Sequence, residues 1–191
     1  MKEPFLEPIL RRMRIGRVVD EVKSIQNCCL LDIGCGFNHR FLSFVEPYIE
    51  YGIGIDFKVH EVSYKKISTK KMTLDETLPF KECAFNAVTM LAVLEHIDKP
   101  RQIISEVYRV LKPEGKFILT VPGKLAKPVL EFLAFKVGVV NKNEIEDHKK
   151  YYDLYELEQL VSNIYGFEIV KHKHFQFGMN NFCVIKKTST S

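Results

Sequence analysis

The stretch from Leu30 to His39 constrains this chain more than any other. A short apolar run, Cys28 to Leu31, leads into Asp32 and two glycines spaced one residue apart, Gly34 and Gly36. Glycine lets the backbone turn at positive φ and lets a ligand approach without a Cβ in the way. A buried strand, a Gly-x-Gly turn and a following helix together form a nucleotide-binding arrangement. We therefore expect the binding site of the chain at this turn.

The spacing of the glycines separates two kinds of nucleotide site. The dinucleotide fingerprint requires a third glycine three residues after the second. That position is His39 here. A NAD-dependent oxidoreductase is therefore a disfavoured alternative, retained on grounds of fold alone.

The second strand supplies another candidate contact. A helix expected over 39–48 begins directly behind the glycines, so its N-terminal amides and positive dipole end face the ligand. Tyr51 to Ile55 then predicts a strand that ends in Asp56, twenty residues past Gly36. An acid at this position is placed to accept hydrogen bonds from ribose hydroxyls. Asp56 and the adjacent Phe57 are therefore candidate cofactor-binding residues.

The motif Asp32-x-Gly34-x-Gly36 resembles the first motif of the class I S-adenosylmethionine (SAM) methyltransferases. That family usually carries a third glycine at the position of Asn38. Asparagine is the commonest non-glycine residue at positive φ, so we expect Asn38 to adopt that backbone conformation.

Further motifs narrow the resemblance to the methyltransferases of ubiquinone and menaquinone biosynthesis. They are an acid-bearing loop before Leu78-Pro79-Phe80, the sequence Phe85-Asn86-Ala87-Val88, and an apolar strand followed by Leu94-Glu95-His96. The segment Arg109 to Gly115 and the strand 116–121 match the family's helix, turn and fifth strand, with Glu114 replacing a common glycine. The resemblance covers residues 28–122 well and the remainder only by the number of elements.

Strands that alternate with helices predict an α/β domain of three layers with a mostly parallel sheet. The resemblance implies a Rossmann-like sheet of seven strands. We expect one SAM-binding domain over residues 1–191, with an N-terminal helical extension over 1–25. A brief helix is expected within 58–71, a third strand around 70–73, an antiparallel pair over 167–174 and 181–186, and a frayed tail at 187–191.

The resemblance also implies a set of site residues for SAM and its product S-adenosylhomocysteine. Asp75 is placed beside the adenine, and Leu91, Glu95 and His96 line the methionine side. The full set of candidate cofactor-binding residues is Asp32, Gly34, Cys35, Gly36, Asp56, Phe57, Asp75, Leu91, Glu95 and His96. If the acceptor is a hydroxyl or a phenol, a general base assists, and His148 is the first candidate and His96 the second.

The acceptor side is expected after the fifth strand. Residues 124–140 are rich in apolar side chains but too short and too charged to span a bilayer. They predict a helix that covers the pocket or the core; a second interpretation is an interfacial helix in peripheral contact with a membrane, serving a lipid-like acceptor. With the polar loop that carries His148, Tyr151 and Tyr152, this composition favours a small apolar, aromatic or lipid-linked acceptor.

Other partners are disfavoured by composition and motif. A net charge of +4 with scattered basic residues does not indicate nucleic acid. Ala92-Val93-Leu94-Glu95 stands where an amine-directed nucleic-acid methyltransferase carries an Asn/Asp-Pro-Pro-aromatic motif. His172 and His174 share a strand face without a third ligand, so no metal site is expected. Five cysteines without paired spacing, and no signal peptide, predict a reduced, cytoplasmic protein. A non-catalytic SAM-binding protein remains an alternative, and the oligomeric state is left open.

Overall fold

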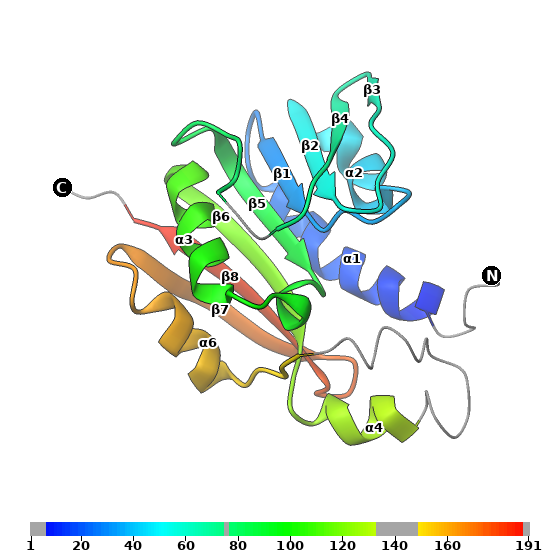
Figure 1. The fold of residues 1–191 in the computed structure, drawn as a ribbon, viewed down its shortest axis with the longest axis vertical. Coiled ribbons are helices and arrows are strands. Elements are labelled where there is room, and N and C mark those ends of the chain that lie inside the picture. The colour runs from blue at the N-terminus through cyan, green and yellow to red at the C-terminus, as the bar shows by residue number, and fades with distance from the viewer. Residues whose placement is uncertain (1–6, 75–76, 133–148, 189–191) are drawn as a thin grey trace.

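The computed structural model describes residues 7–74, 77–132 and 149–188. Eight strands form one sheet in the order β3-β4-β2-β1-β5-β6-β8-β7 (Figure 1). The strands are β1 (Cys29–Ile33), β2 (Tyr51–Asp56), β3 (Ser63–Tyr64), β4 (Ile67–Lys71), β5 (Phe85–Leu91), β6 (Leu111–Pro122), β7 (Phe167–Phe175) and β8 (Asn180–Lys187). The strands from β4 to β6 run parallel, while β8 is antiparallel to both β6 and β7. The expected parallel sheet with an antiparallel C-terminal pair is confirmed.

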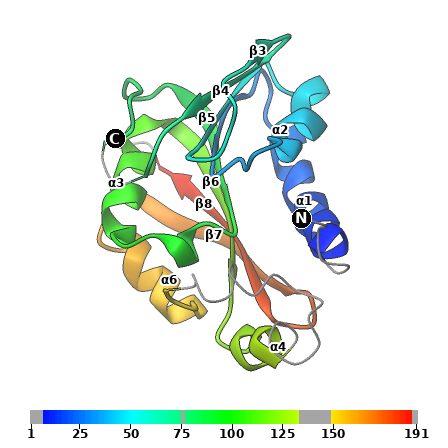
Figure 2. The same cartoon turned by 45° about the vertical axis from the view of Figure 1, so that its right-hand side comes forward.

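Helices cover both faces of the sheet (Figure 2). On one face lie α1 (Glu7–Lys23) and α2 (Arg40–Val45), the latter continued by the 3₁₀ turn η1 (Glu46–Tyr48). On the other face lie α3 (Pro100–Val110) and α6 (Leu154–Val161). Two further elements follow strand ends: the 3₁₀ turn η2 (Leu94–His96) after β5, and α4 (Ala126–Phe132) after β6. The three layers therefore form as expected.

The core explains why the first strand reads as a continuous apolar run. Successive side chains of a strand point to opposite faces, so a strand covered on both sides buries every residue. Leu30 packs into the cluster under α1 and α2, while Leu31 packs into the cluster under α3 and α6. Both are completely buried.

The segment between β2 and β4 differs from the expectation. In place of a brief helix within 58–71, β3 pairs with β4 in a small hairpin whose turn residue Lys65 has a φ of 48°. The third parallel strand is Ile67–Lys71, three residues earlier than expected, and β3 makes eight strands rather than seven. The physical reason is alternation: Ile67 and Thr69 are buried, their neighbour Ser68 is half-buried, and the segment has no apolar stripe for a helix.

Strand β6 begins at Leu111, earlier than the expected residue 116. Glu114 stands where the resembling family commonly has glycine, and its φ is 65°. The left-handed conformation is therefore kept without the glycine that usually supplies it. The Glu114 carboxylate forms an ion pair of 2.5 Å with Lys186 of β8.

The end of the chain follows the sequence pattern closely. A capping box begins α6, with Glu156 N–H donating to the Asp153 carboxylate at 2.9 Å and Asp153 N–H donating to Glu156 at 3.1 Å. Of the apolar stretch 124–140, the helical part within the described residues is α4. No helix in the described ranges is long and apolar enough to cross a membrane.

Candidate active site

The glycine turn folds back onto the end of β2. The Gly34 and Cys35 amides donate to the Ile55 carbonyl at 2.8 and 3.2 Å. The Gly36 amide donates to Asp56 Oδ2 at 2.9 Å. These bonds hold the turn at the carboxyl ends of β1 and β2, which is the edge where open parallel sheets bind their ligands.

The two glycines are required for different reasons. Gly34 has a φ of +74°, and a Cβ built on it would lie 2.3 Å from Cγ2 of Val93, in the segment after β5. Gly36 has a φ of +71°, and a Cβ there would meet no atom within 4 Å. Gly34 therefore allows two segments to pack closely, whereas Gly36 borders open space that a ligand can enter.

The third left-handed residue of the turn is His39, not Asn38. His39 has a φ of 38° and stands directly before α2, while Asn38 is absent from the residues with positive φ. The expectation for Asn38 was therefore wrong by one residue. The His39 amide donates to the Gly36 carbonyl at 3.1 Å, which closes a tight turn and places the left-handed residue at its end.

Asp56 lies at the tip of β2, with 9% of its surface exposed. Its Oδ2 accepts the Gly36 amide and its Oδ1 accepts the Lys58 amide at 2.8 Å. An ionised carboxylate has about four acceptor positions, so two remain for a ligand. Asp56 therefore holds the glycine turn in place and keeps the capacity to accept ribose hydroxyls.

Asp32 is buried beneath the turn at 2% exposure. The Thr89 hydroxyl of β5 donates to its Oδ1 at 2.7 Å. Burial raises the pKa of Asp32 to about 7, and the nearby Asp56 charge acts in the same direction. Asp32 therefore connects β1 to β5 below the site.

The Cys35 side chain packs into the sheet. A Cβ built on Gly54 of β2 would lie 2.8 Å from the Cys35 sulfur, and Cys35 is 8% exposed. Burial raises the pKa of this thiol. The backbone of Cys35 belongs to the turn, but its sulfur is directed into the core.

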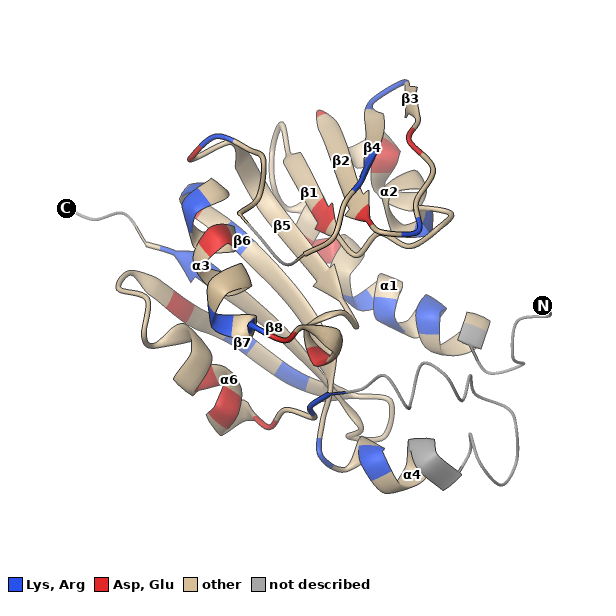
Figure 3. Ribbon diagram, viewed as in Figure 1, with Lys and Arg blue, Asp and Glu red and all other residues tan. Residues whose placement is uncertain are grey.

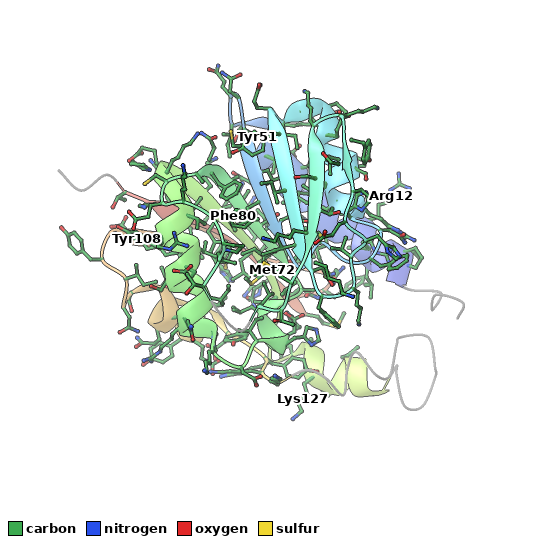
Figure 4. All side chains as sticks on the ribbon, turned by 45° about the horizontal axis from the view of Figure 1, so that its top comes forward. Arg12, Tyr51, Met72, Phe80, Tyr108 and Lys127 are labelled. Atoms are coloured by element: carbon green, nitrogen blue, oxygen red, sulfur yellow. The ribbon has the colours of Figure 1, made fainter. Side chains whose placement is uncertain are left out.

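A pocket of about 310 Å³ lies at the carboxyl end of β4. It is lined by Lys70, Met72, Thr73, Thr77 and Pro79. Met72 is labelled in Figure 4. The expected adenine-side residue Asp75 lies outside the described residues.

Phe57, which directly follows Asp56, presents an aromatic ring at 56% exposure. Lys58 Nζ lies 4.6 Å from the centroid of this ring. The structure therefore leaves an accessible aromatic surface beside the acid at the end of β2.

The residues expected on the methionine side lie at and after the carboxyl end of β5. Leu91 is its last residue, and Glu95 and His96 form part of η2. Leu91 and His96 are half-buried. His148, the first candidate base, lies outside the described residues.

Glu95 is the most buried acid of this group, at 1% exposure. Within the part of the chain that the structure describes, its Oε2 has no hydrogen-bond partner. Burial raises its pKa to about 7, against the opposing influence of Arg14 in α1. Its carbonyl accepts the Lys149 amide at 2.8 Å, which brings residues 149–152 to this edge.

Sequence reasoning missed three residues that shape the site: Ala92, Val93 and Thr89. Ala92 has a φ of 57°, a strained conformation directly after β5, and Val93 occupies the space that a Gly34 side chain would need. The residue spacing carries no signal for either. The alternation of β5 predicts buried positions, but not that Thr89 reaches Asp32.

The pair His172 and His174 does share one face of β7, with ring centroids 4.7 Å apart. The His172 ring nitrogen Nε2 is 2.8 Å from Asn181 Oδ1. Over the described residues, no group of three or more His, Cys, Asp or Glu side chains is arranged to hold a metal ion.

Comparison with known proteins agrees with this geometry. Residues 31–119, from the glycine motif through most of β6, match the family model described as a methyltransferase domain. This match and the fold together support a methyltransferase domain of the class I type in this part of the chain.

The chain is similar over most of its own length to proteins that are named as methyltransferases. It is 26% identical to a demethylmenaquinone methyltransferase from Leptospira interrogans, over 95% of this chain and 84% of the relative. It is 28% identical to the mitochondrial ubiquinone biosynthesis O-methyltransferase of Rattus norvegicus, over 76% of this chain and 43% of the relative. Among solved structures, the YcgJ protein of Bacillus subtilis superposes with a TM-score of 0.66 at 17% identity, covering 94% of this chain and all of YcgJ, which supports the fold.

Proposed function

We propose that this methyltransferase transfers the methyl group of SAM to a small apolar acceptor. The observation that carries the proposal is the glycine turn: it is held against Asp56 and Ile55 at the carboxyl edge of the sheet, and the space beside Gly36 is open.

The residues at this edge fit SAM. A side chain at Gly36 would occupy the open space, so its absence provides a cradle for a ligand. Asp56 would accept from the ribose hydroxyls with its remaining lone pairs, and Phe57 and the pocket after β4 would receive the adenine. Asp75 retains its proposed role beside the adenine. Leu91, Glu95 and His96 would face the methionine part.

SAM, when bound, supplies a methyl group on a positively charged sulfur. The contribution of the chain is to orient the acceptor and to exclude water, since methyl transfer needs little else from side chains. A base helps when the acceptor is a hydroxyl or a phenol. His148 remains the first proposed base and His96 the second.

Two observations support the acceptor class. The two named relatives are a demethylmenaquinone and a ubiquinone-biosynthesis methyltransferase. The segments at the mouth of the site also expose apolar side chains: Leu125 is 71% and Val129 is 39% exposed. Both favour an apolar, aromatic or lipid-linked small molecule over a polyanion.

The proposal also extends to enzymatic activity, domain organisation and location in the cell. The family assignment favours an enzyme over a non-catalytic SAM-binding protein. We propose that residues 1–191 form one domain and that it works in the cytoplasm, in keeping with five cysteines that are all free thiols.

Isothermal titration calorimetry tests the cofactor assignment. We expect S-adenosylhomocysteine to bind with saturable heat and NAD to produce none. Binding of NAD with no response to S-adenosylhomocysteine would overturn the proposal in favour of the oxidoreductase alternative.

A further inference from the structure

The turn between β7 and β8 stands at the mouth of the site. The Gln176 side chain donates to the Leu10 carbonyl of α1 at 2.8 Å. On the other side, the Gly123 amide donates to the Met179 carbonyl at 2.8 Å, just before α4. The turn is therefore bound to α1 and to the β6–α4 junction at once, next to the carboxyl end of β6 (Figure 1).

Phe177 at the tip of this turn is 97% exposed. It lies among three consecutive left-handed residues, with φ of 51° at Gln176, 58° at Phe177 and 82° at Gly178. A bulky side chain in this conformation is strained, and glycine or asparagine would adopt it more easily. Folding gains nothing from a strained and fully exposed phenylalanine. Strain of this kind indicates a functional constraint.

Further exposed apolar side chains lie on the two segments to which the turn is bound. Ile9 and Met13 lie one turn apart on α1, at 50% and 41% exposure. Leu125 directly precedes α4 and Val129 lies within it, at 71% and 39% exposure. We call these four residues and Phe177 the rim.

Basic side chains lie on the same two helices as rim residues. Arg12 of α1 and Lys127 of α4 are exposed, and both side chains extend away from the body of the protein (Figure 4). Figure 3 shows several basic residues along α1 and a basic residue on α4, and acidic residues on α6. The acids Asp153 and Glu156 at the start of α6 are paired with Lys124. The described rim therefore presents apolar tips and positive charge.

We infer that the rim docks the enzyme on the surface of an anionic phospholipid bilayer. The inference rests on the proposed function, because a lipid-linked acceptor would be reached from a bilayer that contacts the carboxyl edge of the sheet, where the rim lies beside the end of β6. Separate apolar tips set among cations match the interfacial region, where apolar side chains enter the acyl boundary and Lys and Arg pair with phosphates.

Vesicle co-sedimentation tests the inference. We expect the intact protein to bind vesicles of phosphatidylcholine mixed with phosphatidylglycerol, and to bind vesicles of phosphatidylcholine alone much more weakly. Phe177→Asn should weaken binding to the mixed vesicles by on the order of tenfold or more, since one buried aromatic side chain is lost. Because asparagine suits the left-handed conformation, Tm should rise by about 2–4 °C rather than fall.

Tyr165→Asn is the matched control. Tyr165 is 85% exposed and precedes β7, whereas Phe177 follows it, so the nine residues of β7 separate them by about 30 Å. The control should bind vesicles like the unmodified protein. If Phe177→Asn fails to fold, Leu125→Ser carries the same expectation.

Two results would overturn the inference. One is equal binding to both vesicle types or to neither. The other is salt-sensitive binding that Phe177→Asn leaves unchanged, which would make the rim a general polyanion surface, for example for RNA. Titration with S-adenosylhomocysteine separates this inference from the proposed function: an unmodified protein that binds the cofactor but no vesicles would refute docking alone.

Discussion

Replacement of Gly34 by alanine probes the contact between the glycine turn and the segment after β5. Two penalties add in this variant. The left-handed backbone, with a φ of +74°, disfavours an alanine by about 1–2 kcal/mol. The new Cβ would also lie 2.3 Å from Val93 Cγ2, and such overpacking typically costs about 1–3 kcal/mol. We therefore expect Gly34→Ala to lower the free energy of unfolding by about 3 kcal/mol.

Gly36→Ala is the matched control, because its φ of +71° is nearly the same and no atom lies within 4 Å of its added Cβ. It should carry only the backbone penalty of about 1–2 kcal/mol. It should nevertheless weaken binding of S-adenosylhomocysteine, since its methyl group enters the open space.

The double variant Gly34→Ala, Val93→Ala isolates the steric penalty. Removal of both Val93 γ-carbons leaves Val93 Cβ, at 3.2 Å, as the nearest atom. Urea denaturation should therefore show a favourable coupling of about 1–3 kcal/mol between the two sites. Equal destabilisation by Gly34→Ala and Gly36→Ala, or no coupling in the double variant, would refute the steric argument.

Three further outcomes follow from the site. Asp56→Ala should weaken binding of S-adenosylhomocysteine by about tenfold or more, because it removes acceptors from both the ribose and the Gly36 amide; unchanged affinity in calorimetry would contradict this. Burial raises the pKa of Asp32 and of Glu95 to about 7, so the folded state holds more protons than the unfolded state above the ordinary carboxyl range, and stability should fall as pH rises towards 7 and level off above it. Thermal unfolding across this range measures the slope, which Asp32→Asn should flatten; an unchanged slope would show that Asp32 is not its source. His148→Ala should lower kcat and kcat/KM together by about a hundredfold with little change in SAM affinity; normal steady-state turnover would exclude it as the base.

The sequence by itself determined the features that depend on local spacing. The apolar run before Asp32 and the two glycines identified the first strand and its turn, because positive φ and burial on both faces each leave a local residue signature. Asp56 was identified by its distance from Gly36 along the chain. The antiparallel C-terminal pair, expected over 167–174 and 181–186, forms within one residue of those boundaries as β7 and β8.

The tertiary structure decided everything that depends on contacts between distant segments. Val93 excludes a side chain at Gly34, and Asp56 accepts a hydrogen bond from the Gly36 amide. Both contacts join segments that meet only in the folded sheet. The left-handed residue is His39 rather than Asn38 because the turn closes on Gly36 before α2 begins. The sequence pattern around Phe177 indicates only a turn between two C-terminal strands. Only packing of that turn between α1 and the β6–α4 junction places it, strained and exposed, at the mouth of the site, because local periodicity carries no information about which distant segments become neighbours.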